Sequence, residues 1–501
     1  MAEILPFQKP SSTSQEGDLE DSALRYELDY PSIILIVLGI ILRVPGLFGD
    51  LWLDEIWGLE AARSIHSPLD FITGQLDGHL TLYTVYLWIV SGSDNPIVLR
   101  LLSFIFGCGL LFILALLIPA SRRVERYTLL FLVAVSYPFI LYSSEARGYS
   151  GMLFFGALSL LLLERQKMEV SEKEAILFFI SNSLAFLFHL SYVQFFGALL
   201  LYGAVLAVGR LSSTKEQWSF LYRLFGPIIL FLIGAYIVVL RLMPQGTGTL
   251  VSYPETIIDA IAVTIGAPLL SEHALAAGTL TLAASLAAIV LLVVEVARQK
   301  SLGLYRWIFF CSALFIMPAA VVFLLEPRIL HPRYFLMSML TSYMVYACLV
   351  SDLQDTARQK FLSIVGLGLL FLFGQASYLV PFFGHGKGEY SSALRRMSSE
   401  IPQDQTGLVS SDHDFRTGKV FRYYQDQLQI KNLSYTPSSE DQDELPAYFI
   451  VHSEDRHFDP PQRLSLGHGK LFVLRDSYES GSLAGFRWFV YSLLQEGRSG
   501  H

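Results

Sequence analysis

Two adjacent carboxylates, Asp54 and Glu55, directly follow the first long apolar run of the chain. Trp52 and Trp57 flank them, and tryptophan is the residue type that prefers the boundary between lipid and water. Ionised carboxylates are costly near hydrocarbon and are usually functional there. A carboxylate at this boundary could accept the proton of an attacking hydroxyl, as a general base does. Asp54 and Glu55 are therefore the candidate catalytic residues.

Further polar residues stand where other apolar runs begin or end. Arginines at such places could bind lipid phosphate, because the guanidinium fork matches its oxygens, and could stabilise the phosphate as it leaves. A sugar linked to phosphate needs no general acid, since phosphate is already a good leaving group. The combination is typical of glycosyl transfer from a lipid-phosphate donor. The candidate substrate-binding residues are Asp77, His79, Glu145, Arg147, Tyr149, Arg328, His331, Arg333 and Tyr334.

Each of these residues also has an ordinary explanation. Acids after a membrane span can simply solvate a loop, and Arg147 or Arg333 could anchor a helix end or form an internal ion pair. His79 and His331 could be plain hydrogen-bonding residues. Asp77 with His79 could ligate a divalent metal, although no tight spacing of His, Asp and Glu supports a metal site, and no cofactor is otherwise expected. The clustering of the polar residues is what favours function.

The composition indicates a membrane protein. Of 501 residues, 53% are hydrophobic and 16% charged, with a mean hydropathy of +0.47. A spanning helix takes roughly 20 apolar residues, and the net charge of −8 argues against a nucleic-acid partner. We expect a polytopic α-helical protein with about eleven transmembrane helices. The predicted spans are 30–48, 96–118, 126–143, 148–164, 175–190, 192–209, 223–242, 273–295, 305–325, 333–350 and 361–383.

The distribution of Lys and Arg sets the expected orientation. Residues 1–29 are polar and acidic without a basic region before an apolar core, so we expect a cytoplasmic amino terminus and no cleaved signal peptide. The alternate loops that carry the basic residues then all face the cytoplasm. This holds only if 79–91 lies on the membrane surface rather than spanning it. The first loop, 49–95, and the loop 243–272, with an interfacial or re-entrant segment at 257–270, then lie on the outer face with the candidate site.

The composition becomes polar at about His385. Short apolar runs alternate with helical patterns from there on, which predicts a small α/β domain outside the membrane at 385–501. The three cysteines lie in apolar runs before this point and are interpreted as packing residues. The expected organisation is a cytoplasmic segment 1–29, a transmembrane domain 30–384 and this extracytoplasmic domain.

The sequence resembles the polytopic glycosyltransferases of the GT-C fold, in particular bacterial relatives of protein O-mannosyltransferases and of the aminoarabinose transferase that modifies lipid A. The similarity covers roughly residues 30–350. It implies that the first-loop aspartate, Asp54, is the catalytic base, that the donor is a polyprenyl-phosphate sugar, and that Arg147 and Arg333 contact its phosphate. The relatives usually have His-Pro-Pro-Leu where this chain has His79-Leu-Thr-Leu82. The matching stretches are Asp54-Glu55, Asp77–Tyr83, Asn95–Ser103, Tyr142–Tyr149 and, more weakly, Pro332–Tyr334.

We therefore expect an inverting hexosyl or pentosyl transferase in a bacterial inner membrane, acting on its extracytoplasmic face. The acceptor hydroxyl would belong to a protein, a lipid or a glycan, and Glu55 would shape the pocket or hold the acceptor. A transporter or flippase for a lipid-linked saccharide is the main alternative. Transporters tend to have paired repeats and ionisable groups near the midplane, whereas these spans are nearly free of interior charge. A non-catalytic scaffold would leave Asp54, Glu55 and the outer arginines unexplained.

Overall fold

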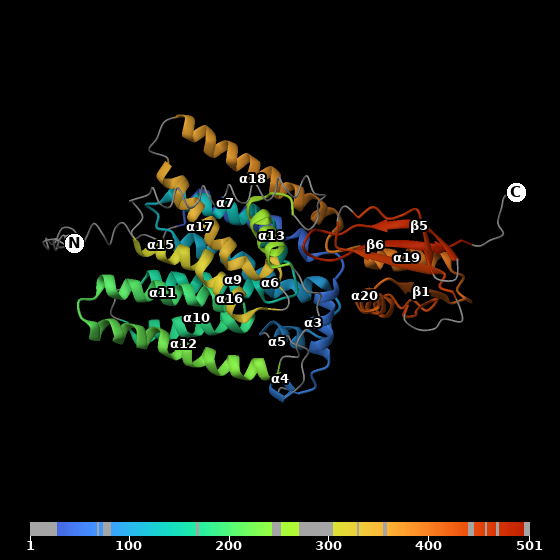
Figure 1. Cartoon of the computed structure of the whole chain (residues 1–501), viewed down its shortest axis with the longest axis horizontal. Coiled ribbons are helices and arrows are strands. Elements are labelled where there is room, and N and C mark those ends of the chain that lie inside the picture. Colours follow the sequence, from blue (N-terminus) through green and yellow to red (C-terminus); the bar gives the residue numbers. More distant parts are fainter. Residues whose placement is uncertain are drawn as a thin grey trace.

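The computed structural model describes residues 28–494 except 68–69, 74–81, 167–169, 243–251, 270–303, 328–329, 354–357, 439–444, 456–457 and 467–469. A bundle of long helices runs side by side, and a β-sheet lies beyond one end of it (Figure 1). The helices of the bundle and its surface are α2 (Tyr30–Arg43), α3 (Leu53–Arg63), α4 (Asp70–Thr73), α5 (Leu82–Ile89), α6 (Pro96–Leu117), α7 (Arg123–Val135), α8 (Tyr137–Tyr142), α9 (Tyr149–Glu164), α10 (Glu172–Phe188), α11 (Tyr192–Arg210), α12 (Thr214–Leu242), α13 (Tyr253–Ile265), α15 (Leu304–Cys311), α16 (Met317–Leu325), α17 (Leu336–Leu353) and α18 (Arg358–His385).

Six helical segments among the described residues are long and apolar enough to cross a membrane, so the chain is a polytopic integral membrane protein. Helices overlap every predicted span that falls within the described residues, but eleven crossing helices are not confirmed. The predicted span 273–295 lies outside the described residues, and α9 has only 16 residues. The six segments are Tyr30–Leu47, Pro96–Leu117, Tyr192–Arg210, Thr214–Ala235, Tyr305–Leu324 and Pro332–Ser351.

The predicted span 126–143 is broken into α7 and α8 at Ser136. Pro138 has no N–H and cannot bond the carbonyl of Ala134, so the end of α7 needs other donors. Arg43, buried at the end of α2, donates to the carbonyl oxygens of Val133 at 3.2 Å and Ala134 at 3.5 Å. A cation at a helix C-terminus also suits the helix dipole. This break turns the chain toward the α8–α9 turn, which carries candidate site residues.

Short helices lie at the end of the bundle nearest the sheet. α3 runs across the helix ends between bundle and sheet (Figure 1), and α5 packs against it. α5 has eight residues, fewer than a helix needs to cross a bilayer. Residues 79–81 of the predicted surface segment 79–91 lie outside the described residues, so its placement on the membrane surface stays a prediction. α13 has 13 residues and ends at Gly266, whose φ of +80° is the left-handed conformation that suits a helix C-terminus. It packs against the turn that carries Arg333.

The carboxyl-terminal part contains a six-stranded sheet with helices α19 (Tyr390–Glu400) and α20 (Asp414–Gln427), so the predicted strands and helices after residue 385 form a small sheet structure. The strand order is β2-β1-β3-β6-β5-β4. β1 pairs with β2 and β3 in parallel, whereas β3, β6, β5 and β4 pair antiparallel. The strands are β1 (Gly407–Ser411), β2 (Leu433–Tyr435), β3 (Tyr448–Ser453), β4 (Arg463–Leu466), β5 (Lys470–Tyr478) and β6 (Arg487–Leu493).

The carboxyl-terminal part is docked onto the first loop. The Tyr424 hydroxyl on α20 bonds to both the N–H and the carbonyl of Leu51, the latter at 3.0 Å. The N–H of Ser391 donates to the carboxylate of Asp50 at 2.6 Å. The first loop is thus held between the helix bundle and the sheet.

Candidate functional site

Asp54 and Glu55 lie in the first turn of α3, where the N-terminal end of the helix dipole favours negative charge. The Glu55 carboxylate accepts a hydrogen bond from the N–H of Trp52 at 3.3 Å, which helps to cap the helix. Consecutive residues on a helix do not face the same way. The two carboxylates therefore have different partners.

Glu55 lies in a buried ion cluster. Arg100 on α6 binds it through two parallel hydrogen bonds of 2.8 and 2.7 Å, and Lys387, just after α18, lies 3.1 Å away. The N–H of Ala146 adds a fourth contact at 2.8 Å. Burial would raise the pKa of Glu55, but the charges of Arg100 and Lys387 and the hydrogen bonds outweigh it and lower the pKa to about 2. Glu55 is therefore an ion that joins α3, α6, the α8–α9 turn and the end of α18.

The rest of the Arg100 guanidinium organises the chain between α2 and α3. It donates to the backbone carbonyls of Phe48 at 3.0 Å and Asp50 at 2.7 Å. Because this segment leads directly into α3, Arg100 fixes the position from which the first turn of α3 starts.

Asp54 contacts two arginines from distant parts of the chain. One of its carboxylate oxygens lies 2.5 Å from Arg147 in the α8–α9 turn and 3.0 Å from Arg333 in the short helix Pro332–Phe335 before α17. The exposed fractions of the three side chains are only 14%, 15% and 10%. Two guanidinium groups share one carboxylate, so this trio carries an excess positive charge in a largely buried place.

Aromatic and imidazole rings surround the two arginines. Arg147 lies 5.7 Å from the centre of the Tyr149 ring, and Arg333 lies 5.7 Å from Trp52 and 6.0 Å from Tyr334. The His331 ring is 5.7 Å from Tyr334. Burial, with the charge of Arg333, lowers the pKa of His331 to about 3, so its imidazole is neutral near pH 7.

Several buried polar atoms at this place have no hydrogen-bond partner among the described residues. They are the indole N–H of Trp52, the hydroxyl of Tyr149, the Nε of Arg333 and both carboxylate oxygens of Glu145. Buried polar groups are normally paired. Three of these groups are donors, which suits an anion as the missing partner.

The structure brings together seven of the predicted site residues, and Glu55 lies in the adjoining ion cluster. Asp77, His79 and Arg328 lie outside the described residues, so a metal at Asp77 with His79 remains a prediction. Within the described ranges, no three His, Cys, Asp or Glu side chains are placed to hold a metal ion. The seven residues are Asp54, Glu145, Arg147, Tyr149, His331, Arg333 and Tyr334.

Sequence reasoning missed the contacts of Lys387 and Phe486. Lys387 is a basic residue just past a predicted span on the expected outer face, the same signal that singled out Arg147. It could therefore have been named as a candidate site residue, although not as the partner of Glu55. Phe486 packs edge-on against Trp52 at 6.1 Å and lies under Arg416 at 5.3 Å. These contacts bring the carboxyl-terminal part to the border of the site.

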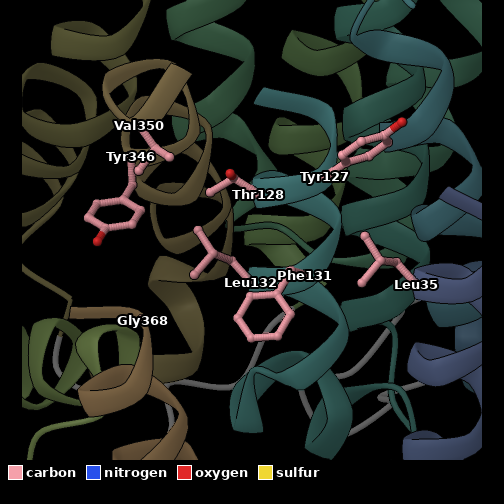
Figure 2. Close-up of a pocket in the computed structure, with 8 residues that line it drawn as sticks. All are labelled: Leu35, Tyr127, Thr128, Phe131, Leu132, Tyr346, Val350 and Gly368. Carbon is pink, nitrogen blue, oxygen red and sulfur yellow. The ribbon is translucent and has the colours of Figure 1, made fainter. Parts of the chain in front are cut away.

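A separate apolar crevice lies between α2, α7, α17 and α18 (Figure 2). Among the described residues that line it, the polar side chains are those of Tyr127, Thr128 and Tyr346, and none is a carboxylate or a basic group. It therefore lacks the chemistry of the Asp54 cluster. The remaining residues that line it are Leu35, Phe131, Leu132, Val350 and Gly368.

No family model matches the chain, and no curated protein matches it. Among solved structures, the chain is similar to the crystal structure of ArnT from Cupriavidus metallidurans bound to undecaprenyl phosphate. The identity is 12%, the match covers 94% of this chain and 99% of that chain, and the TM-score is 0.32. The similarity is too distant to carry an activity from that protein to this one.

Proposed function

We propose that this protein is a membrane glycosyltransferase that moves a sugar from a polyprenyl-phosphate donor to an acceptor hydroxyl on the extracytoplasmic face, with inversion at the anomeric carbon. The observation that carries the proposal is the Asp54 carboxylate held between Arg147 and Arg333 at the end of the helix bundle. A carboxylate that can act as a base, Asp54, is thus in direct contact with two arginines that can bind a phosphate.

Arg147 and Arg333 would bind the phosphate of the donor. A guanidinium matches phosphate oxygens with paired N–H groups, and charge-assisted bonds of this kind are strong. The unpaired Nε of Arg333, hydroxyl of Tyr149 and indole N–H of Trp52 would supply further donors to the same anion. As the bond to the sugar breaks, negative charge grows on the phosphate, and donors that are already in place stabilise it.

Asp54 would act as the general base. It would take the proton of the acceptor hydroxyl while the hydroxyl oxygen forms a bond to the anomeric carbon, and the bonding pair to phosphate would leave with the phosphate. Asp54 becomes neutral as the phosphate gains a charge, so proton and charge are balanced. When the donor phosphate occupies the arginines, their hold on Asp54 weakens, and the carboxylate becomes available to the acceptor. Glu55, bound to Arg100 and Lys387, would shape the pocket by fixing the start of α3.

The proposed face follows from the positive-inside pattern of the loops. The acceptor would be a protein, a lipid or a glycan, and the location a bacterial inner membrane. The sequence resemblance of residues 30–350 to GT-C enzymes implies the same class of donor.

Purified protein reconstituted in liposomes with polyprenyl-phosphate sugars, together with a cell-envelope extract as the source of acceptor, tests the proposal. We expect sugar to leave the lipid and to appear on an acceptor. If the lipid-linked sugar instead crosses the bilayer with its phosphate bond intact, the protein is a flippase and the proposed chemistry is wrong.

Arg147→Gln and Arg333→Gln are each expected to weaken binding of a polyprenyl phosphate by about 10- to 100-fold, because a hydrogen bond to a charged group is worth about 1.5–3 kcal/mol. Titration of purified protein in detergent with the lipid measures this directly. Lysine at either position keeps the positive charge but lacks the paired N–H groups of the guanidinium. The lysine variants should therefore bind the lipid more tightly than the glutamine variants and more weakly than the wild type.

The matched control for these variants is Arg63→Gln. Arg63 forms a more exposed ion pair with Asp94, at 2.8 Å, and both residues lie in the first loop. The Arg63→Gln variant should bind the lipid as tightly as the wild type. Equal losses in all three variants would mean a general charge effect rather than a phosphate site.

A further inference from the structure

Glu145 is a buried carboxyl group in the α8–α9 turn that the proposed reaction does not use. Its exposed fraction is 0%, and neither of its carboxyl oxygens has a hydrogen-bond partner among the described residues. Its backbone neighbours are fixed, because the carbonyl of Ser144 accepts from Lys387 and the N–H of Ala146 donates to Glu55. The turn therefore cannot easily swing the side chain out to water.

Charged groups from each neighbouring element act on this carboxyl. Lys387 after α18, Arg147 in the same turn and Arg333 before α17 favour its ionised form, whereas Glu55 on α3 opposes it. Arg100 on α6 and the hydroxyls of Tyr142 and Tyr149 also interact with it electrostatically.

Burial is the strongest influence, and it raises the pKa of Glu145 to about 7 despite the three cations. Glu145 therefore differs sharply from Glu55, its neighbour in space. Glu55 accepts five hydrogen bonds and stays ionised. Glu145 accepts none among the described residues, and only the electric field of nearby cations favours its ionised form. Its charge state must respond when that field changes.

We infer that Glu145 takes up a proton when a phosphate anion binds to Arg147 and Arg333, and releases it when the anion leaves. This inference rests on the proposed function, in which these arginines hold the donor phosphate. An anion there cancels part of the positive field that keeps Glu145 ionised, so the neutral acid becomes the favoured form.

The coupling is reciprocal, as binding linkage requires. If the bound anion favours the protonated carboxyl, a protonated carboxyl favours the bound anion. Anion affinity should therefore decrease as the pH rises through about 7. Near neutral pH the site would bind a lipid phosphate together with a fraction of a proton.

Calorimetric titration in buffers of different ionisation enthalpy counts the protons. The probe is the methyl ester of a polyprenyl phosphate, because this diester carries one fixed charge and does not itself titrate near pH 7. For the whole protein in detergent at pH 7 we expect uptake of roughly half a proton per lipid bound. Glu145→Gln should still bind the probe, with uptake near zero and an affinity that varies less with pH.

Glu125→Gln is the matched control, since Glu125 is a buried carboxyl near the other end of α7, paired with Arg122 at 2.6 Å. It should leave proton uptake as in the wild type. Undiminished uptake in Glu145→Gln would overturn the inference and point to Lys387, whose pKa burial lowers to about 8.

Two further measurements separate a failure of this inference from a failure of the proposed function. Should Glu145→Gln not fold, infrared difference spectra of the wild type with and without the probe still decide, because a newly protonated carboxyl gives a C=O stretching band and its absence contradicts the inference. Failure of the proposed function would look different. In that case the probe would bind equally well to wild type, Arg147→Gln and Arg333→Gln, or to none of them.

Discussion

Asp54→Asn should lower the rate of sugar transfer by about 100- to 10,000-fold, the range that general bases contribute. Asparagine has nearly the same shape as aspartate but cannot accept a proton from the acceptor hydroxyl. The affinity for the donor lipid, in contrast, should not fall. Arg147 and Arg333 lose the carboxylate that competes with phosphate for them, so the variant should bind polyprenyl phosphate at least as tightly as the wild type.

Single-turnover transfer and lipid titration on the same preparation measure the two effects. Asp94→Asn provides a control, because Asp94 is an acid of the same loop whose ion pair with Arg63 is partly exposed. It should retain both activities. A variant at Asp54 that transfers sugar at the wild-type rate would remove this residue from the chemistry, and one that loses lipid binding would mean that Asp54 holds the donor site together.

Glu55→Gln is expected to lower the free energy of unfolding by about 3–5 kcal/mol, because it leaves Arg100 and Lys387 buried without their common counter-charge. Thermal unfolding in detergent, followed by tryptophan fluorescence, would report the loss. The double variant Glu55→Gln/Arg100→Met removes one of the stranded charges and should be less destabilised than the sum of the two single variants.

Glu60→Gln is the matched control for this effect. Glu60 lies on the same helix and pairs with Lys419 of α20 at 2.6 Å, but the two side chains are 40% and 24% exposed. Exposed pairs contribute about 0–1 kcal/mol. Similar losses in Glu55→Gln and Glu60→Gln would show that burial does not set the cost.

The lowered pKa of Glu55 also predicts a pH dependence. A carboxyl whose pKa is lower in the folded than in the unfolded protein stabilises the fold above its unfolded pKa, and the contribution is lost as the pH falls toward the folded value. The stabilisation by Glu55 should therefore be complete above about pH 5 and decline toward pH 2. Glu55→Gln should reduce this acid-side decline.

The sequence predicted most of the helices because a helix that crosses the hydrocarbon core needs a long run of apolar residues, and such runs are visible in a sequence. It did not predict the break between α7 and α8, although Pro138 marked it. The expectation that the spans are nearly free of interior charge also needs qualification. Arg43 and Arg100 are fully buried in helices, each within a few residues of a helix end, where backbone carbonyls or Glu55 satisfy them.

The site was predictable to the extent that polar residues at helix ends on one face must lie near one another. That reasoning placed Asp54, Arg147 and Arg333 in one region, and the structure joins them directly. It could not separate the environments of Asp54 and Glu55, because adjacent positions look equivalent in a sequence. Nor could it identify Lys387 as a partner of Glu55, since that contact depends on how the carboxyl-terminal part docks.

The pairing of Glu55 with Lys387 joins residues 332 positions apart, and that of Leu51 with Tyr424 joins residues 373 apart. During synthesis the first loop is therefore made long before the segments that lock it in place. Until Lys387 has been made, Arg100 is the only one of the two buried cations available to Glu55. A chain that ends before Lys387 would therefore lack both of these contacts to its first loop.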